Sequence, residues 1–266
     1  MRDSGISAAA LARLCAARHG AHMAEILHHR LYDGRRIAFR LTPGRGPCLV
    51  FLPGYMSDMS GSKASALFAE AEARGRACLL IDYSGCGQSE GSFAEGTLSR
   101  WRDEVLALVS SYVAGPVLLV GSSMGGWLML LVAERLGPRC AGLIGIAPAP
   151  DFTRWGLSAA ERAALAAGET IHQPNPYGPE PTPIHPGFFA DAENHLRLES
   201  ARGLSCPVRL IHGKRDEDVP WEISLRLKAA LGSADVQVSL VEDGDHRLSR
   251  PEDIARILAL VGEFYP

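Results

Sequence analysis

Apolar residues in this chain gather into short runs that alternate with longer stretches of helical periodicity. The short runs predict strands, and they span 48–52, 77–81, 117–120, 141–147, 208–211 and 236–241. The helical stretches span 63–74, 101–112, 127–136, 222–231 and 252–264. Runs that are apolar throughout are typical of a parallel sheet covered on both faces. The alternation therefore predicts an α/β fold, with a mostly parallel sheet and helices on both of its faces.

The first part of the pattern is different and predicts a hairpin. Residues 28–32 and 36–41 flank the turn dipeptide Asp33-Gly34, which favours two antiparallel strands joined by a tight turn. We place this hairpin at an edge of the sheet, which then has eight strands.

The regular alternation stops between about 149 and 204. Within this segment, 173–187 is dense in proline and is predicted to be irregular. We interpret 149–204 as a short lid insertion, because an insertion after a strand lies where α/β sheets bind their ligands. The remaining chain, 23–266, is predicted to form one domain, and 1–22 an N-terminal extension or helix.

Composition and charge narrow the class of protein. A net charge of −3 and a pI near 6.3 provide no basic surface for nucleic acid. No apolar run reaches the roughly 18 residues that stable membrane insertion requires. The six cysteines lack metal-binding or disulfide spacing, which indicates a reducing compartment. We therefore expect a cytoplasmic protein, or a mitochondrial one if the alanine- and arginine-rich residues 1–22 form a transit peptide.

The candidate nucleophile is Ser123, in Gly121-Ser122-Ser123-Met124-Gly125. This G-x-S-x-G sequence lies between a predicted strand and a predicted helix, and it resembles the nucleophile elbow of the α/β-hydrolases. Glycines flank such a serine because a Cβ would clash with the strand or the helix. The N–H of Met124 is predicted to lie at a helix N-terminus, where it can stabilise an oxyanion.

A second oxyanion donor is predicted in the loop after the first buried strand. In the α/β-hydrolase arrangement this loop supplies the other N–H group. Here the loop begins Pro53-Gly54-Tyr55-Met56, and the N–H of Tyr55 is our candidate.

The general base and its orienting acid follow from chain order, which in this fold is serine, then acid, then histidine. His246 follows the last predicted strand and is the only histidine after the acid candidates. Asp216 lies four residues after His212 in an H-G-x-x-D-x-x-V-P segment, which recurs in α/β-hydrolases with the aspartate as triad acid. Asp218 is the second candidate for the acid and Asp151 the third.

Aromatic side chains of the insertion are candidates for binding an acyl chain. We select Trp155, Phe188 and Phe189, although packing of the insertion onto the domain explains each of them equally well. No cofactor and no metal are predicted. The G-x-G at 85–87 has Glu90 where a dinucleotide-binding motif has its third glycine.

Longer motifs surround these candidates. They are Leu-Pro-Gly-Tyr at 52–55, Asp-Tyr-Ser-Gly-Cys-Gly-Gln-Ser at 82–89, Gly-Ser-Ser-Met-Gly-Gly-Trp-Leu-Met-Leu at 121–130 and Asp-His-Arg at 245–247. From about residue 47 onward the chain resembles the mitochondrial palmitoyl-protein thioesterase family of α/β-hydrolases, which are also acyl-glucuronide esterases. The resemblance implies hydrolysis of S-acyl cysteine thioesters and acyl-glucuronide esters without a cofactor. It also implies that Ser123, Asp216 and His246 form the catalytic triad.

We therefore expect a serine hydrolase that cleaves carboxylic esters or thioesters of small-molecule or acylated-peptide substrates. Carbon–carbon bond hydrolases and small peptidases of the same fold share the triad and stay alternatives. A non-catalytic binding module is a further alternative, which an intact triad disfavours. The richness in alanine, arginine and glycine suits a bacterial member, to which mitochondrial location and protein depalmitoylation would not transfer.

Overall fold

An eight-stranded sheet runs through the part of the chain that the computed structural model describes, residues 25–199 and 203–265. The predicted extension at 1–22 lies outside the described residues. The strands are β1 (Leu27–Arg30), β2 (Arg36–Thr42), β3 (Arg45–Leu52), β4 (Arg76–Ile81), β5 (Val117–Ser122), β6 (Cys140–Ile146), β9 (Val208–Gly213) and β10 (Val236–Val241). Their spatial order is β1-β2-β4-β3-β5-β6-β9-β10.

Pairing within the sheet is parallel from β4 to β10, and antiparallel between β1, β2 and β4. The mostly parallel eight-stranded sheet and the edge hairpin are thus confirmed. Register aligns Leu52 of β3, Gly121 of β5 and Gly145 of β6 in neighbouring strands. The loops that follow these strands therefore begin at the same edge of the sheet.

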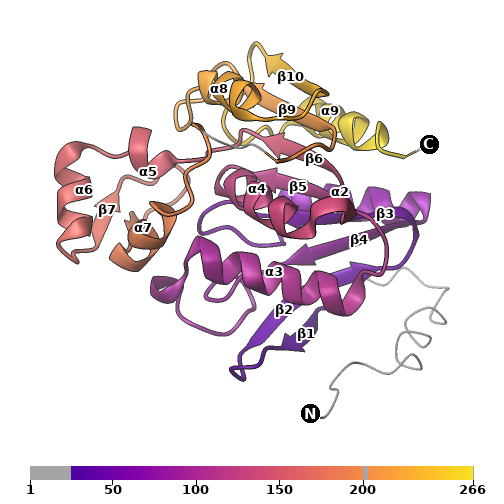
Figure 1. The fold of residues 1–266 in the computed structure, drawn as a ribbon, viewed down its shortest axis with the longest axis horizontal. Helices are drawn as coiled ribbons and strands as arrows, with labels where there is room; N and C mark the ends of the chain where they lie inside the picture. The colour runs from indigo at the N-terminus through magenta and orange to yellow at the C-terminus, as the bar shows by residue number, and fades with distance from the viewer. Residues whose placement is uncertain (1–24, 200–202, 266) are drawn as a thin grey trace.

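Helices cover both faces of the sheet, as the apolar runs predicted (Figure 1). The two faces have separate cores: α2 (Ser62–Arg74) and α9 (Pro251–Gly262) pack on one face, and α3 (Leu98–Tyr112), α4 (Met124–Leu136) and α8 (Glu222–Ala230) on the other. Every residue of β5 is buried, because helices cover it from both sides. Two short 3-10 helices, Phe93–Glu95 and Gly137–Arg139, complete this part. In residues 25–199 and 203–265, no helix combines the length and apolar character needed to cross a membrane.

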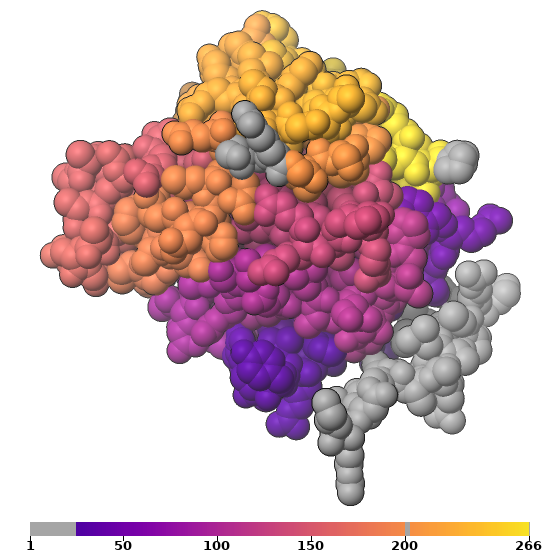
Figure 2. All heavy atoms as spheres, viewed as in Figure 1, coloured from indigo at the N-terminus to yellow at the C-terminus, as the bar shows by residue number. Residues whose placement is uncertain are grey.

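The insertion between β6 and β9 projects to one side of the sheet (Figures 1 and 2). It contains α5 (Phe152–Trp155), α6 (Ala159–Ala166), a two-stranded sheet of β7 (Ile171–Gln173) and β8 (Thr182–Ile184), and α7 (Pro186–Ala192). The prediction that 173–187 is irregular is wrong at its C-terminal end. Pro183 is tolerated in a two-stranded ribbon and Pro186 at a first helical position, so neither proline prevents regular structure.

Candidate active site

Ser123 occupies a strained turn between β5 and α4. Its φ of 54° and ψ of −121° lie in a backbone region that residues other than glycine rarely adopt. A Cβ on Gly121 would lie 2.3 Å from the carbonyl oxygen of Gly125, and one on Gly125 would lie 2.1 Å from that of Leu52. Both positions therefore require glycine, as the motif predicted. The turn follows the carboxyl end of β5 and packs against the carboxyl end of β3.

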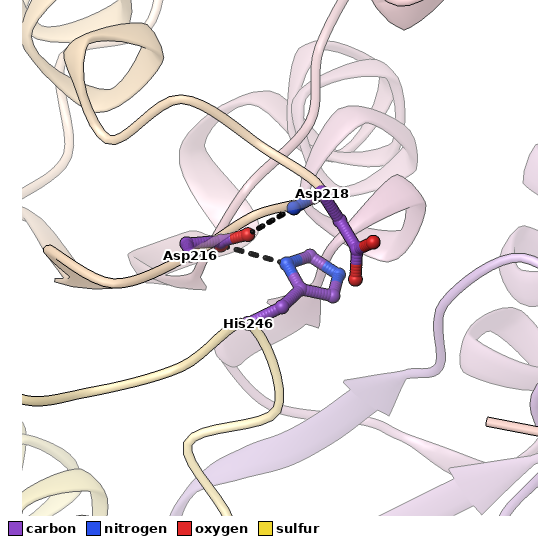
Figure 3. A group of neighbouring side chains, drawn as sticks. All are labelled: Asp216, Asp218 and His246. Carbon is purple, nitrogen blue, oxygen red and sulfur yellow. Dashed lines mark hydrogen bonds and ion pairs between the residues drawn. The ribbon is translucent and has the colours of Figure 1, made fainter. Parts of the chain in front are cut away.

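Loops after the last two strands bring His246 and Asp216 to this serine. His246 follows β10, and its Nε2 lies 3.1 Å from the hydroxyl oxygen of Ser123. Asp216 follows β9, and its Oδ2 accepts a hydrogen bond from Nδ1 of His246 over 2.7 Å (Figure 3). The two contacts make one chain of hydrogen bonds from carboxylate to imidazole to hydroxyl, the arrangement that acyl transfer by a serine needs.

Asp216 receives hydrogen bonds on both of its oxygens. His212, fully buried in β9, places Nε2 at 3.0 Å from Oδ2 of Asp216, while the N–H groups of Asp218 and Val219 donate to Oδ1. Burial alone would raise the pKa of Asp216. The hydrogen bonds from His212 and His246, with the positive field of His246, outweigh burial and hold this pKa well below its usual range. The carboxylate therefore stays ionised and can stabilise a positively charged imidazole.

The tautomer of His212 is fixed by its neighbours. Its Nε2 faces two acceptors, Asp216 and the carbonyl oxygen of Val219 at 3.0 Å, so it must carry a hydrogen. Nδ1 then accepts the hydroxyl hydrogen of Ser224 over 2.7 Å. His212 thus holds the acid in position and does not approach Ser123.

The other two acid candidates have different partners. The carboxylate of Asp218 lies beside His246 (Figure 3). It accepts a hydrogen bond from the hydroxyl of Tyr177. Both oxygens of Asp151 accept N–H groups of Arg197 and Leu198 in the insertion.

Asp216, Asp218 and His246 place one ligand atom each within 4.8 Å of one another, a spacing that could also hold a cation. These groups already have partners. Asp216 accepts hydrogen bonds on both oxygens, Nδ1 of His246 carries a hydrogen toward Asp216, and Nε2 of His246 faces the hydroxyl of Ser123. A cation bound by Nε2 of His246 would displace its contact with Ser123.

The two predicted oxyanion donors flank Ser123. Within the described chain, neither the N–H of Tyr55 nor that of Met124, the first residue of α4, donates a hydrogen bond. Gly54 brings its loop close to the serine, since a Cβ there would lie 3.3 Å from Cβ of Ser123. Two unpaired donors beside a nucleophile are suited to a tetrahedral oxyanion.

Residues after β4 anchor the Tyr55 loop. Buried Asp82 accepts the N–H groups of Met59 and Gln88 at 2.7 and 2.8 Å, and the hydroxyl of Tyr83 donates to the carbonyl oxygen of Pro53 over 3.1 Å. Burial raises the pKa of Asp82, and the two N–H donors oppose that shift. The motif at 82–89 therefore positions the Tyr55 loop.

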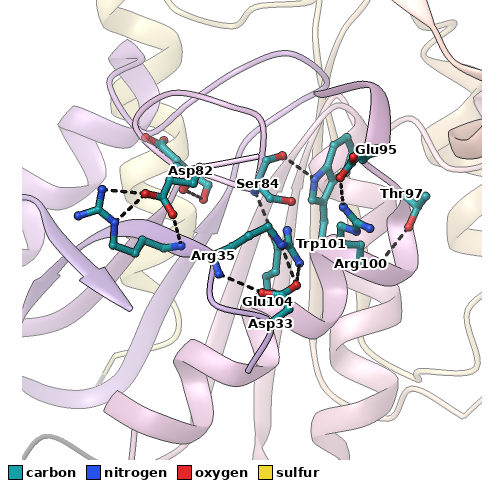
Figure 4. A network of polar contacts seen from close by, with 12 residues as sticks. Asp33, Arg35, Asp82, Ser84, Glu95, Thr97, Arg100, Trp101 and Glu104 are labelled. Atoms are coloured by element: carbon teal, nitrogen blue, oxygen red, sulfur yellow. Dashed lines mark hydrogen bonds and ion pairs between the residues drawn. The ribbon is translucent and has the colours of Figure 1, made fainter. Parts of the chain in front are cut away.

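A buried acid, Glu104 of α3, supports the loop between β4 and α3 (Figure 4). Its carboxylate pairs with Arg35 at 2.8 Å and accepts the N–H of Ser84 at 2.9 Å. The indole of Trp101 donates to the carbonyl oxygen of Ser84 over 3.2 Å. The same loop carries Phe93, which packs on the ring of Tyr55. Through this contact the network around Glu104 helps to hold the Tyr55 loop in place.

We expect Glu104→Ala to lower the free energy of unfolding by about 2 to 3 kcal/mol. The substitution leaves the N–H of Ser84 without an acceptor and Arg35 without its buried partner. The expected loss is smaller than breaking a buried ion pair usually causes, because Arg35 also pairs with Asp33 at 2.6 Å. Glu104→Gln keeps an acceptor and should cost about 1 kcal/mol. Urea unfolding measures both, and a change under about 0.5 kcal/mol for the alanine variant would contradict the role of this network.

Two cavities meet at Ser123, and Tyr55, Ser57, Tyr177 and His246 line both. The larger one, here the insertion cavity, has a volume of about 470 Å³. Its apolar wall includes Met56, Met124, Ala149, Phe152, Trp155 and Ile184. The smaller one, here the α2 cavity, has a volume of about 260 Å³ and lies between the Tyr55 loop, the start of α2 and the loop after His246.

The three predicted substrate-binding aromatics occupy different places. Trp155 lines the insertion cavity, and its indole donates to the carbonyl oxygen of Pro150 over 2.8 Å. Phe188 and Phe189 are buried and line neither of the two cavities. Phe188 packs on the ring of Tyr55 at a centroid distance of 5.0 Å, so its influence on substrate would be indirect.

Sequence reasoning did not identify His212 or Asp82 as parts of the site. A signal existed for both: His212 begins the motif that contains Asp216, and Asp82 directly follows a buried strand. Each is a polar residue at the carboxyl end of a parallel strand, where α/β sheets build their sites.

Comparisons with known proteins identify the family to which the fold belongs. Residues 49–257 match the model of the "Alpha/beta hydrolase family". The human mitochondrial palmitoyl-protein thioesterase ABHD10 is 36% identical over 235 residues, which cover 87% of this chain and 77% of that protein. The structure of mouse alpha/beta hydrolase domain-containing protein 10 has a TM-score of 0.83 at 35% identity and covers 90% of this chain and 98% of its own. A putative hydrolase from Agrobacterium vitis S4 has the same TM-score at 36% identity, with coverages of 91% and 98%.

Proposed function

Since this chain belongs to the alpha/beta hydrolase family and is a hydrolase of esters or thioesters, we propose that Ser123 is its nucleophile and that long-chain S-acyl thioesters are its preferred substrates. The observation that supports this assignment is the hydrogen-bonded chain from Asp216 through His246 to Ser123, at the mouth of a cavity with an apolar wall.

The reaction has two steps. His246 takes the proton of the Ser123 hydroxyl as its oxygen attacks the carbonyl carbon, and the N–H groups of Tyr55 and Met124 bind the oxyanion. Collapse of this intermediate breaks the bond to the leaving group, which takes the proton from His246. Water, deprotonated by His246, then attacks the acyl-enzyme and releases the carboxylic acid and free Ser123. Asp216 holds the imidazole throughout, and the side chains supply every proton transfer without a cofactor.

The choice of substrate rests on the insertion cavity and on the relatives. The apolar wall fits an acyl chain, and the curated relatives are named palmitoyl-protein thioesterases. Acylated peptides and small acyl esters or thioesters are therefore the substrates to test. For location we propose the cytoplasm, or the mitochondrion if 1–22 is a transit peptide, in line with the relatives' names. Import of the full chain into isolated mitochondria tests that choice.

We expect the rate of hydrolysis to rise with acyl length. Each methylene that enters the insertion cavity contributes up to about 0.8 kcal/mol, which is about fourfold in kcat/KM. The measurement is a series of p-nitrophenyl esters from acetyl to palmitoyl, with an S-palmitoyl peptide alongside. Trp155→Ala removes part of the apolar wall and should lower the dodecanoyl-to-butyryl ratio of kcat/KM about tenfold.

Tyr32→Ala is the matched control, because Tyr32 is fully exposed on the edge hairpin and should leave the ratio unchanged. Rates that fall steadily beyond butyryl in the wild type would contradict the long-chain assignment, as would a ratio that Trp155→Ala does not alter.

A further inference from the structure

The α2 cavity differs in chemistry from the insertion cavity that it meets at Ser123. Its wall includes two cationic side chains, Lys63 of α2 and Arg247, which follows His246 in the chain. The apolar wall of the insertion cavity includes no cation. A substrate that spans Ser123 would therefore meet an apolar surface on one side and positive charge on the other.

Among the described residues, neither cation forms an ion pair with a carboxylate within 4.0 Å, although Asp245 acts on Lys63 from a greater distance. The Lys63 ammonium donates one hydrogen bond, over 2.5 Å, to the carbonyl oxygen of Arg247. The Arg247 guanidinium lies over the ring of Tyr177, 5.3 Å from its centroid. Asp58 is the acid in this wall, and it accepts the N–H and hydroxyl of Ser60 at 2.7 and 2.5 Å. The wall thus has two positive charges and one negative charge.

The apolar wall of the insertion cavity indicates which part of a substrate is left for the α2 cavity. His246 lines both cavities, and its Nε2 must pass a proton to the leaving group. If the acyl chain lies against the apolar wall of the insertion cavity, the α2 cavity is the other space at Ser123 and His246 that can receive the leaving group.

We propose that Lys63 and Arg247 form a leaving-group subsite, which selects esters and thioesters whose leaving group carries a carboxylate or a phosphate. The inference rests on the proposed function, because it places the acyl chain in the insertion cavity. Lys63 is the stronger determinant, since its ammonium is half-buried and held by the Arg247 carbonyl, whereas the Arg247 side chain is exposed.

Matched thioesters test the subsite. S-octanoyl 3-mercaptopropionate and its methyl ester share the acyl chain and the thiol, and differ only in the anionic charge. S-octanoyl pantetheine, with and without its phosphate, forms the second pair, which distinguishes a carboxylate from a phosphate. We expect the wild type to hydrolyse the anionic member of at least one pair with a kcat/KM about tenfold higher, as a charged hydrogen bond to substrate provides.

Variants separate this subsite from general effects on activity. Lys63→Met should reduce the anionic-to-neutral ratio to about one, and Arg247→Met should reduce it about threefold. Lys228→Met, an exposed lysine on α8, is the control that should leave the ratio unchanged. A wild-type ratio of one or less, or a ratio that neither Lys63→Met nor Arg247→Met changes, overturns the subsite. If the wild type hydrolyses none of the four thioesters, the proposed function fails and the subsite with it.

The pH dependence of the anionic-to-neutral ratio is a further test. If Lys63 had only a structural role, the ratio would not change with pH. Burial lowers the pKa of Lys63 to about 8; the positive charge of Arg247 adds to this shift and the negative charge of Asp245 opposes it. The ammonium is therefore charged below about pH 8 and neutral above it. Asp58 and His246 also line the cavity. The requirement for an unprotonated His246 applies to both members of a pair, so this requirement cancels in the ratio.

We expect the anionic preference to fall between about pH 6.5 and about pH 9, and Lys63→Arg, which keeps its charge, to retain it at the higher pH. An unchanged wild-type preference across this range would contradict a role for the Lys63 charge.

Discussion

Ser123→Ala should abolish hydrolysis of esters and thioesters, with an expected loss in kcat of about 10⁴-fold to 10⁶-fold. The hydroxyl of Ser123 is the one that meets Nε2 of His246, at 3.1 Å, so no neighbouring hydroxyl can replace it without moving the base. The strained backbone at this residue also fixes the direction of the side chain. The measurement is kcat for p-nitrophenyl octanoate and for an S-palmitoyl peptide.

Folding of the Ser123→Ala variant is checked by circular dichroism and urea unfolding, since one hydroxyl contributes little to the core. Ser110→Ala, on the exposed surface of α3, is the matched control and should keep wild-type rates. Residual activity within about tenfold of the wild type would mean that Ser123 is not the nucleophile.

Asp216→Asn should lower kcat by about 10⁴-fold while the protein stays folded. An asparagine at 216 can turn its N–H₂ group toward Nδ1 of His246, which favours the tautomer with the hydrogen on Nε2. That nitrogen could then no longer accept the proton of Ser123. The substitution also removes the charge that stabilises the imidazolium formed in both steps.

Asp218→Asn discriminates between the two acids of this loop. Asp218 accepts a hydrogen bond from Tyr177 and gives only its backbone N–H to Asp216, so we expect kcat within about threefold of the wild type. A larger loss from Asp218→Asn than from Asp216→Asn would reverse the assignment of the acid.

Much of the fold could be predicted from the sequence, because the patterns that indicate its strands, helices and turns are local and agree with one another. Continuous apolar runs such as 117–120 identify buried parallel strands, and the glycines of 121–125 identify a turn that tolerates no Cβ. Chain order then selected His246, and the H-G-x-x-D-x-x-V-P segment selected Asp216 over Asp218 and Asp151. The structure brings His246 and Asp216 together with Ser123.

The insertion was less predictable, because its short elements owe their structure to contacts with the rest of the protein. Strand β8 contains Pro183 and has only three residues, so local propensity does not indicate it. Its carbonyl oxygen at Pro183 accepts the hydroxyl hydrogen of Tyr55, a contact between residues 128 positions apart. Long-range contacts of this kind also bury Phe188 against Tyr55, which no helical or strand period could reveal.

The α2 cavity was not predicted, because it too depends on contacts between distant parts of the chain. Lys63 lies in a helical stretch, where a lysine ordinarily faces solvent, and Arg247 is one of many arginines. Only the packing of α2 beside the loop after His246 brings the Lys63 ammonium to the Arg247 carbonyl. The positive wall therefore comes from tertiary structure, whereas the residues of the proposed triad could be selected from the sequence.

The measurement that most directly tests the central assignment is to identify the residue that a fluorophosphonate modifies. The active wild-type enzyme is incubated with the probe, digested and mapped by mass spectrometry while residual hydrolysis of p-nitrophenyl octanoate is followed. We predict one adduct, on Ser123, whose extent matches the loss of activity, and no adduct in Ser123→Ala. Loss of activity with the adduct on another residue, or full activity after Ser123 is modified, would contradict the account.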